Sequence, residues 1–301
     1  GPFVQQARDL EGRMRAAYRH ALAGLKSREA ARAPTDDDLG REPPTPEELA
    51  AYIAHKTGQK TGAGHVTVSN LRQLIAVNSK DIIFFDVDGV PGWPASVVFR
   101  RLRGFSVNDL ASMTYEANLL KVMGEAGVPG PRPLLVDETG GPFGAAFMMM
   151  ERVPGSQQQA ANLGAAGRAV AEDIAQVLAR IHQVDPILVA RPTELALGPH
   201  ERILRHIERH YDQWRANSAE PSATVEAAYA WVRRNVAVLS DATVLVHGDV
   251  DLRNMLIEDG RLSAVLDWER SHVGHPAEDL AYLRRDIEAL RRESGRPPVD
   301  L

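Results

Sequence analysis

Three polar side chains near the C-terminal end of the chain have types and spacing suited to metal-assisted chemistry. Asp249 and Asn254 lie five positions apart in a loop between two apolar segments, and Asp267 follows the next predicted hairpin. Mg²⁺ is a hard cation that prefers carboxylate and carbonyl oxygens as ligands. Proton transfer from a reacting hydroxyl needs a base that is separate from the metal ligands. These three residues are therefore the first candidates for an active site.

The surrounding sequence indicates which chemistry this is. An Asp-x-x-x-x-Asn motif followed by a later Asp is the arrangement that protein kinases use for phosphoryl transfer. Here the motifs are HGDVDLRN at 247–254, LDWE at 266–269 and GHPAEDLA at 274–281. Together they resemble the aminoglycoside phosphotransferase and choline kinase family of the kinase-like fold, in particular the branch associated with acyl-CoA dehydrogenases. The resemblance extends over roughly residues 65–301 and is weaker in its first half.

The resemblance implies a role for each of these residues. Asp249 would be the catalytic base, and Asn254 and Asp267 would be the Mg²⁺ ligands. Three neighbours would support them: His247 braces the loop, Asp279 holds the loop from beneath, and Glu269 contacts the metal or the substrate.

An upstream strand is expected to supply a cation for the nucleotide phosphates. Strand alternation places Val98 and Arg100 on one face. By the resemblance, Arg100 takes the position of the phosphate-binding lysine of kinases, and Arg101 is the neighbouring alternative. A guanidinium is always charged and binds phosphate oxygens in a bidentate fork. Glu116, on the following helix, is the predicted ion-pair partner.

The resemblance also implies ATP or GTP, with Mg²⁺, as cofactors. Backbone groups at Met150, Glu151 and Arg152 would meet the purine, and Ser79 would donate to phosphate from the first hairpin loop. Relatives usually have two glycines before this serine, whereas residues 75–80 read IAVNSK. Glycine lets backbone N–H groups approach phosphate closely. The altered loop therefore motivates an alternative, a catalytically weak or inactive kinase-like binding protein.

The secondary-structure elements that must position these residues are mainly strands in the first half of the chain and mainly helices after it. Strands are predicted at 66–68, 82–85, 96–99, 134–136 and 145–150, with one helix at 107–125. Helices then follow at 165–184, 203–214 and 225–239, before short strands at 244–246, 255–257 and 262–266. The predicted fold class is α+β. It is a bilobal, protein-kinase-like fold with an antiparallel N-terminal sheet, one main helix in that lobe, and a mainly helical C-terminal lobe.

Three segments follow from this pattern. Residues 1–64 are predicted to be a helical extension and linker, with helices at 3–32 and from Thr45 to Thr57. Residues 65–152 form the nucleotide-binding lobe, and residues 153–301 form the lobe with the catalytic loop, metal site and acceptor site. This last lobe is expected to be incomplete, with residues missing near Arg284 and after Leu301, because the family's final helices do not follow.

Composition excludes several other classes of protein. The chain has 301 residues and no cysteine, which excludes a disulfide framework and a cysteine nucleophile. Its net charge of −5 argues against nucleic-acid binding. No apolar run is long enough to cross a membrane, and no signal-peptide pattern appears, so a cytoplasmic protein is expected. The N-terminal helix motivates homodimerisation as a further hypothesis.

The expected function is that of a small-molecule kinase. It would transfer the γ-phosphoryl group of ATP or GTP to a substrate hydroxyl. The resemblance leaves two kinds of acceptor open: an antibiotic, either an aminoglycoside or a macrolide, and a hydroxyacyl-CoA.

Overall fold

A computed structural model describes residues 43–61, 65–74, 80–102, 112–158, 166–190, 192–218, 220 and 222–284. These residues divide into two compact units. One unit comprises described residues between 192 and 243, and the other comprises described residues from 43 to 190 and from 244 to 284. The predicted helix at 3–32 lies outside the described residues.

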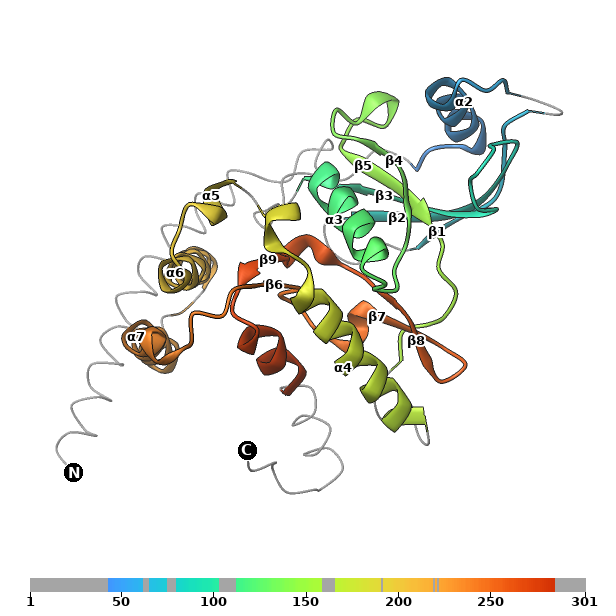
Figure 1. Cartoon of the computed structure of the whole chain (residues 1–301). Coiled ribbons are helices and arrows are strands. Elements are labelled where there is room, and N and C mark those ends of the chain that lie inside the picture. The colour runs from blue at the N-terminus through green and yellow to red at the C-terminus, as the bar shows by residue number, and fades with distance from the viewer. Residues whose placement is uncertain are drawn as a thin grey trace. The chain divides into compact units, whose positions relative to one another are not determined.

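The larger unit contains a five-stranded antiparallel sheet (Figure 1). Its strands, in the spatial order β1-β2-β3-β5-β4, are β1 (Thr67–Leu74), β2 (Lys80–Asp88), β3 (Ser96–Leu102), β4 (Pro133–Asp137) and β5 (Phe147–Glu151). Strands β2 and β3 pair as antiparallel neighbours, and residues 89–95 connect them. Gly89 has φ +82°, and a Cβ there would lie 2.4 Å from the carbonyl oxygen of His65. Only glycine fits this turn.

Two helices belong to opposite faces of this sheet. Helix α2 (Pro46–Thr57) begins with a capping box between Thr45 and Glu48, and it packs with Phe85, Phe99 and Phe147. Helix α3 (Met113–Glu125) begins after the N-cap Ser112 and packs with Met148 and Met150. Consecutive residues of β5 therefore face different cores, as strand alternation requires. The first part of the predicted helix at 107–125 lies outside the described residues.

The rest of the larger unit carries a long helix and two strand pairs. Helix α4 (Gly167–Gln183) buries one apolar stripe, which consists of Val170, Ile174, Val177, Leu178 and Ile181. Strand β6 (Val244–Val246) pairs with β9 (His272–Gly274), and β7 (Met255–Glu258) pairs with β8 (Arg261–Val265). Short 3₁₀ turns follow at Leu252–Asn254 and Trp268–Arg270. The sequence did not predict β9, which has only three residues.

The smaller unit is helical. It contains α5 (Pro192–Leu195), α6 (Pro199–Asn217) and α7 (Ala223–Asn235). Arg233 on α7 forms a bidentate pair with Glu208 on α6, at 2.6 and 2.7 Å. Among the described helices of both units, none combines the length and the apolar composition that crossing a bilayer requires.

Candidate functional site

The loop between β6 and β7 brings Asp249 and Asn254 together. The side-chain amide of Asn254 donates to the carbonyl oxygen of Asp249 at 3.0 Å and to its carboxylate at 3.1 Å. The loop turns tightly at Gly248, where φ is +79° and a Cβ would lie 2.6 Å from the carbonyl oxygen of Arg270. A glycine at this position therefore lets the loop pass directly over the neighbouring segment.

Asp279 lies beneath this loop and is fully buried. Its carboxylate accepts hydrogen bonds from the backbone N–H groups of His247, at 3.0 Å, and Gly248, at 2.9 Å. His182 on α4 contacts the same carboxylate through Nε2 at 2.9 Å. Sequence reasoning missed His182, because a helix residue 97 positions away carries no local signal of this contact.

His247 links the loop to the segment that carries Asp267. Its Nε2 lies 3.0 Å from the carbonyl oxygen of Leu266, and its ring packs against Trp268 with ring centroids 4.6 Å apart. The backbone N–H of Leu266 donates to the carbonyl oxygen of Asn254 at 2.7 Å. These contacts place the backbones of the two predicted metal ligands, Asn254 and Asp267, side by side.

Asp267 has a backbone conformation that is uncommon for a residue with a Cβ. Its φ of +63° lies in the left-handed region, and it caps the 3₁₀ turn at Trp268–Arg270. Burial disfavours the charged form, but the positive charges of Lys80 and Arg100 outweigh burial and lower the pKa of Asp267. The carboxylate is therefore ionised at neutral pH, as a metal ligand must be.

Lys80 is a component of the site that sequence reasoning did not single out. Its Nζ lies 3.1 Å from Asp267 Oδ1 and also forms an ion pair with Glu269. Burial and the nearby Arg100 disfavour the charge of Lys80, but the two carboxylates outweigh them and raise its pKa. Strand alternation was the available signal, because it places Lys80 on the same face of β2 as Ile82, which pairs with Arg100 on β3.

Arg100 and Glu116 form a buried ion pair between β3 and α3. Burial disfavours the charge of Arg100, but Glu116 outweighs this and raises its pKa. Among the described residues, Arg100 Nε is buried without a hydrogen-bond partner. Buried polar groups are nearly always hydrogen-bonded, so this nitrogen is a donor that a bound anion would satisfy.

The alternative cation, Arg101, lies on the other face of β3. It binds the buried Asp81 through Nε at 3.0 Å and Nη2 at 2.6 Å, and it donates to the carbonyl oxygen of Phe143 at 3.2 Å. Arg101 therefore joins β2 to β3, whereas Arg100 lowers the pKa of Asp267.

The predicted purine-binding segment follows β5. Met150 is buried, the N–H of Glu151 donates to Arg132 at 2.9 Å, and the N–H of Arg152 donates to Ser96 at 3.1 Å. Neither N–H group can donate to a purine without giving up its bond to the sheet. In the described part of the chain, the N–H of Val153 is the next one and has no partner. Ser79 lies outside the described residues.

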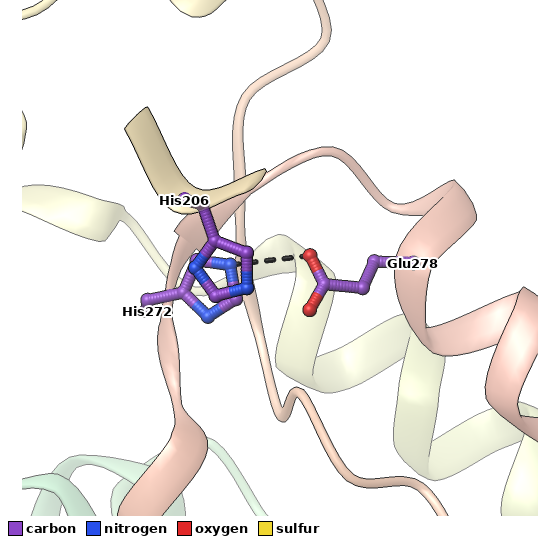
Figure 2. Close-up of side chains that lie close together, drawn as sticks. All are labelled: His206, His272 and Glu278. Carbon is purple, nitrogen blue, oxygen red and sulfur yellow. Dashed lines mark hydrogen bonds and ion pairs between the residues drawn. The ribbon is translucent and has the colours of Figure 1, made fainter. Parts of the chain in front are cut away.

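A second pair joins β9 to the helical turn that contains Asp279. His272 is buried and points its Nε2 at the carboxylate of Glu278, 3.2 Å away, as the dashed line in Figure 2 shows. Its Nδ1 lies 2.9 Å from the carbonyl oxygen of Arg270. His206, which Figure 2 also labels, belongs to α6 in the other unit.

The donor set fits a divalent cation together with a polyphosphate. Asn254 and Asp267 offer oxygen ligands of the kind that Mg²⁺ prefers. Arg100 and Lys80 supply positive charge on the same side of the sheet, and Nε of Arg100 has no acceptor among the described residues. The arrangement can therefore bind a metal–nucleotide complex next to the carboxylate of Asp249.

Comparison with known proteins places this site in context. The model of the phosphotransferase enzyme family matches residues 84–298. Acyl-CoA dehydrogenase family member 10 of Mus musculus is 32% identical over 173 residues, which cover 56% of this chain and 16% of that protein. Family member 11 of Rattus norvegicus is 26% identical over 246 residues, which cover 78% and 30%. The chain thus spans less than a third of the length of these curated relatives.

Solved structures show the same fold. A putative aminoglycoside phosphotransferase from Ralstonia eutropha matches with a TM-score of 0.57 and 22% identity, over 84% of this chain and 81% of that one. Aminoglycoside phosphotransferase APH(4)-Ia, in a complex with ADP and hygromycin B, matches with 0.58 and 18%, over 82% and 83%. Macrolide 2'-phosphotransferase MphH from Brachybacterium faecium matches with 0.55 and 20%, over 83% of each chain. The predicted kinase-like α+β fold is confirmed.

Proposed function

The chain belongs to the phosphotransferase enzyme family, and from this premise we propose that it is a small-molecule kinase. It transfers the γ-phosphoryl group of ATP or GTP to a substrate hydroxyl. The observation that carries the proposal is the convergence of Asp249, Asn254 and Asp267, held by backbone contacts between their loops. The buried Arg100–Glu116 pair supports it from the sheet side.

The residues of this chain divide the work as follows. Asn254 and Asp267 hold Mg²⁺, which when bound neutralises charge on the nucleotide phosphates. Arg100, positioned by Glu116, donates to phosphate through the nitrogen that has no partner among the described residues. Asp249 accepts the proton of the attacking hydroxyl, and Asn254 keeps its carboxylate in place. Catalysis then consists mainly of positioning and charge stabilisation.

The test combines nucleotide binding with turnover. The full chain is titrated calorimetrically with ATP and with GTP, each with and without Mg²⁺. ADP or GDP release is then followed with a panel of hydroxyl acceptors: aminoglycosides, a macrolide and a hydroxyacyl-CoA. The printed names of the relatives and structural neighbours motivate this panel. The acceptor that stimulates product release identifies the substrate class.

Two variants separate catalysis from binding. Asp249→Ala should lower turnover by about 10²–10⁴-fold, the usual contribution of a general base, and leave the affinity for nucleotide with Mg²⁺ nearly unchanged. Asp267→Ala should remove the Mg²⁺ dependence of nucleotide binding. Normal turnover by Asp249→Ala would refute the assignment.

The alternative, a kinase-like binding protein without activity, predicts different results in the same experiments. It requires nucleotide binding that is weak or independent of Mg²⁺ and no product release with any acceptor. The same titrations therefore decide between the two proposals, and an Asp267→Ala variant that binds nucleotide as the parent chain does would favour the binding protein.

A further inference from the structure

Lys80 occupies a place that neither the family motifs nor the proposed mechanism explains. Its side chain is only 14% exposed and lies between two carboxylates, Asp267 and Glu269. Asp267 is a proposed metal ligand. A lysine buried against such a carboxylate supplies, within the protein itself, positive charge that a bound cation would otherwise supply.

The position of Lys80 in the sheet brings it close to the second cation of the site. It is the first residue of β2, and Ile82, two positions on and on the same face, pairs with Arg100. The positive charge of Arg100 acts on Lys80, and both cations act on Asp267. When a divalent cation binds Asp267, three positive centres lie close together, and repulsion favours movement of the flexible lysine toward any nearby anion.

We propose that Lys80 is a nucleotide-phosphate-binding residue. It neutralises Asp267 and Glu269 in the absence of metal, and it contacts phosphate oxygens once a divalent cation binds Asp267. The inference rests on the proposed function and deepens it. It also gives this chain a cationic phosphate contact at the end of a segment whose sequence, IAVNSK, lacks the family's glycines.

Lys80→Met tests the proposal because it removes the charge and keeps much of the side-chain volume. The matched control is Lys121→Met, since Lys121 is exposed on α3. Two affinities are measured on the full chain: Mn²⁺ alone, by electron paramagnetic resonance, and ATP, ADP and AMP with Mg²⁺, by calorimetry. In Lys80→Met, Mn²⁺ alone should bind more tightly, because the two carboxylates no longer have their lysine. ATP with Mg²⁺ should bind about 10–100-fold more weakly, as loss of a charge-assisted hydrogen bond implies.

The remaining measurements show which part of the nucleotide Lys80 contacts and whether its positive charge is what binds it. AMP should bind within about twofold of the parent chain, because the lost contact is beyond the first phosphate, and Lys80→Arg should restore most of the ATP affinity. Lys80→Gln repeats the test with a polar side chain if the Met variant does not fold, which circular dichroism would show. Lys121→Met should match the parent chain throughout.

The outcomes distinguish this inference from the proposed function. If the parent chain binds ATP with Mg²⁺ and Lys80→Met binds it equally or more tightly, Lys80 only neutralises the two carboxylates, and the inference fails while the kinase proposal stands. If the parent chain binds none of ATP, ADP, GTP and GDP, both fail, and if it binds only the guanine nucleotides, the same comparison of Lys80→Met with the parent chain is made with GTP, GDP and GMP.

Discussion

At the scale of single residues, the Arg100–Glu116 pair is the most constrained feature of the site. Both side chains are buried, 9% and 5% exposed, so each charge depends on the other for compensation. Removal of one partner from a buried pair leaves an uncompensated charge, which usually costs more than removal of both. Nε of Arg100 also has no hydrogen-bond acceptor among the described residues, so the same side chain that stabilises the fold can bind a ligand.

Substitution of Glu116 should therefore destabilise the protein strongly. Glu116→Ala is expected to lower the free energy of unfolding by about 3–5 kcal/mol, measured by urea denaturation. The double variant Arg100→Met with Glu116→Ala should lose less than the sum of the two single variants, because no buried charge is left alone. Strict additivity of the two single changes would show that the pair is not coupled.

At the scale of elements, the loop between β6 and β7 depends on hydrogen bonds to Asp279 as well as on contacts within the loop. The carboxylate of Asp279 accepts from two consecutive N–H groups of the loop and contacts His182 on α4. Helix α4 and the loop after β6 therefore both contact the buried carboxylate of Asp279. This convergence fixes where Asp249 lies relative to Asn254.

Removal of this anchor should affect turnover more than nucleotide affinity. In Asp279→Ala, two buried N–H groups lose their acceptor, which should cost about 1–3 kcal/mol each in unfolding free energy. The displaced loop should lower kcat, while the KM for nucleotide changes little. Glu278→Ala is the control, because Glu278 is a neighbour on the same turn but makes a partly exposed contact with His272. Equal effects of the two substitutions on kcat would contradict a specific role for Asp279.

At the scale of the whole molecule, every described residue of the candidate site belongs to the larger unit. The three-helix unit between 192 and 243 contributes none of them. Within this unit, the carboxylates of Asp137 and Asp173 have lowered pKa values because they accept hydrogen bonds from other side chains. Hydrogen bonds from Thr139 and Tyr52 hold the pKa of Asp137 low, and the hydrogen bond from Arg261 lowers that of Asp173.

These carboxylates should make the larger unit sensitive to acid. Their pKa values are lower in the folded than in the unfolded chain, so the unfolded chain binds protons first as the pH falls. Their stabilising contribution is thus complete above the unfolded pKa, about 3.9, and decreases at lower pH. Asp137→Asn should lower the Tm at pH 7 and flatten its decline between pH 5 and pH 3. Asp212→Asn, an exposed control on α6, should melt as the parent chain does at both pH values.

Local patterns predicted most of the architecture around the site. The apolar runs at 82–85 and 96–99 identified the two strands of the β2–β3 hairpin, and the spacing of motifs at 247–254 and 266–269 singled out residues that lie together in the structure. Two contributions were not predicted. His182 contacts Asp279 across 97 positions, and Lys80 contacts Asp267 across 187. Such contacts depend on how helix and sheet pack, which no short window of sequence contains.

The left-handed backbone of Asp267 has a consequence for how this chain responds to selection. A residue with a Cβ costs about 1 kcal/mol or more in this conformation, and glycine would relieve that cost. Glycine would also remove the ion pair between Asp267 and the buried Lys80. A screen that rewards only heat resistance is therefore expected to replace Asp267 together with Lys80, and so to remove the proposed metal ligand.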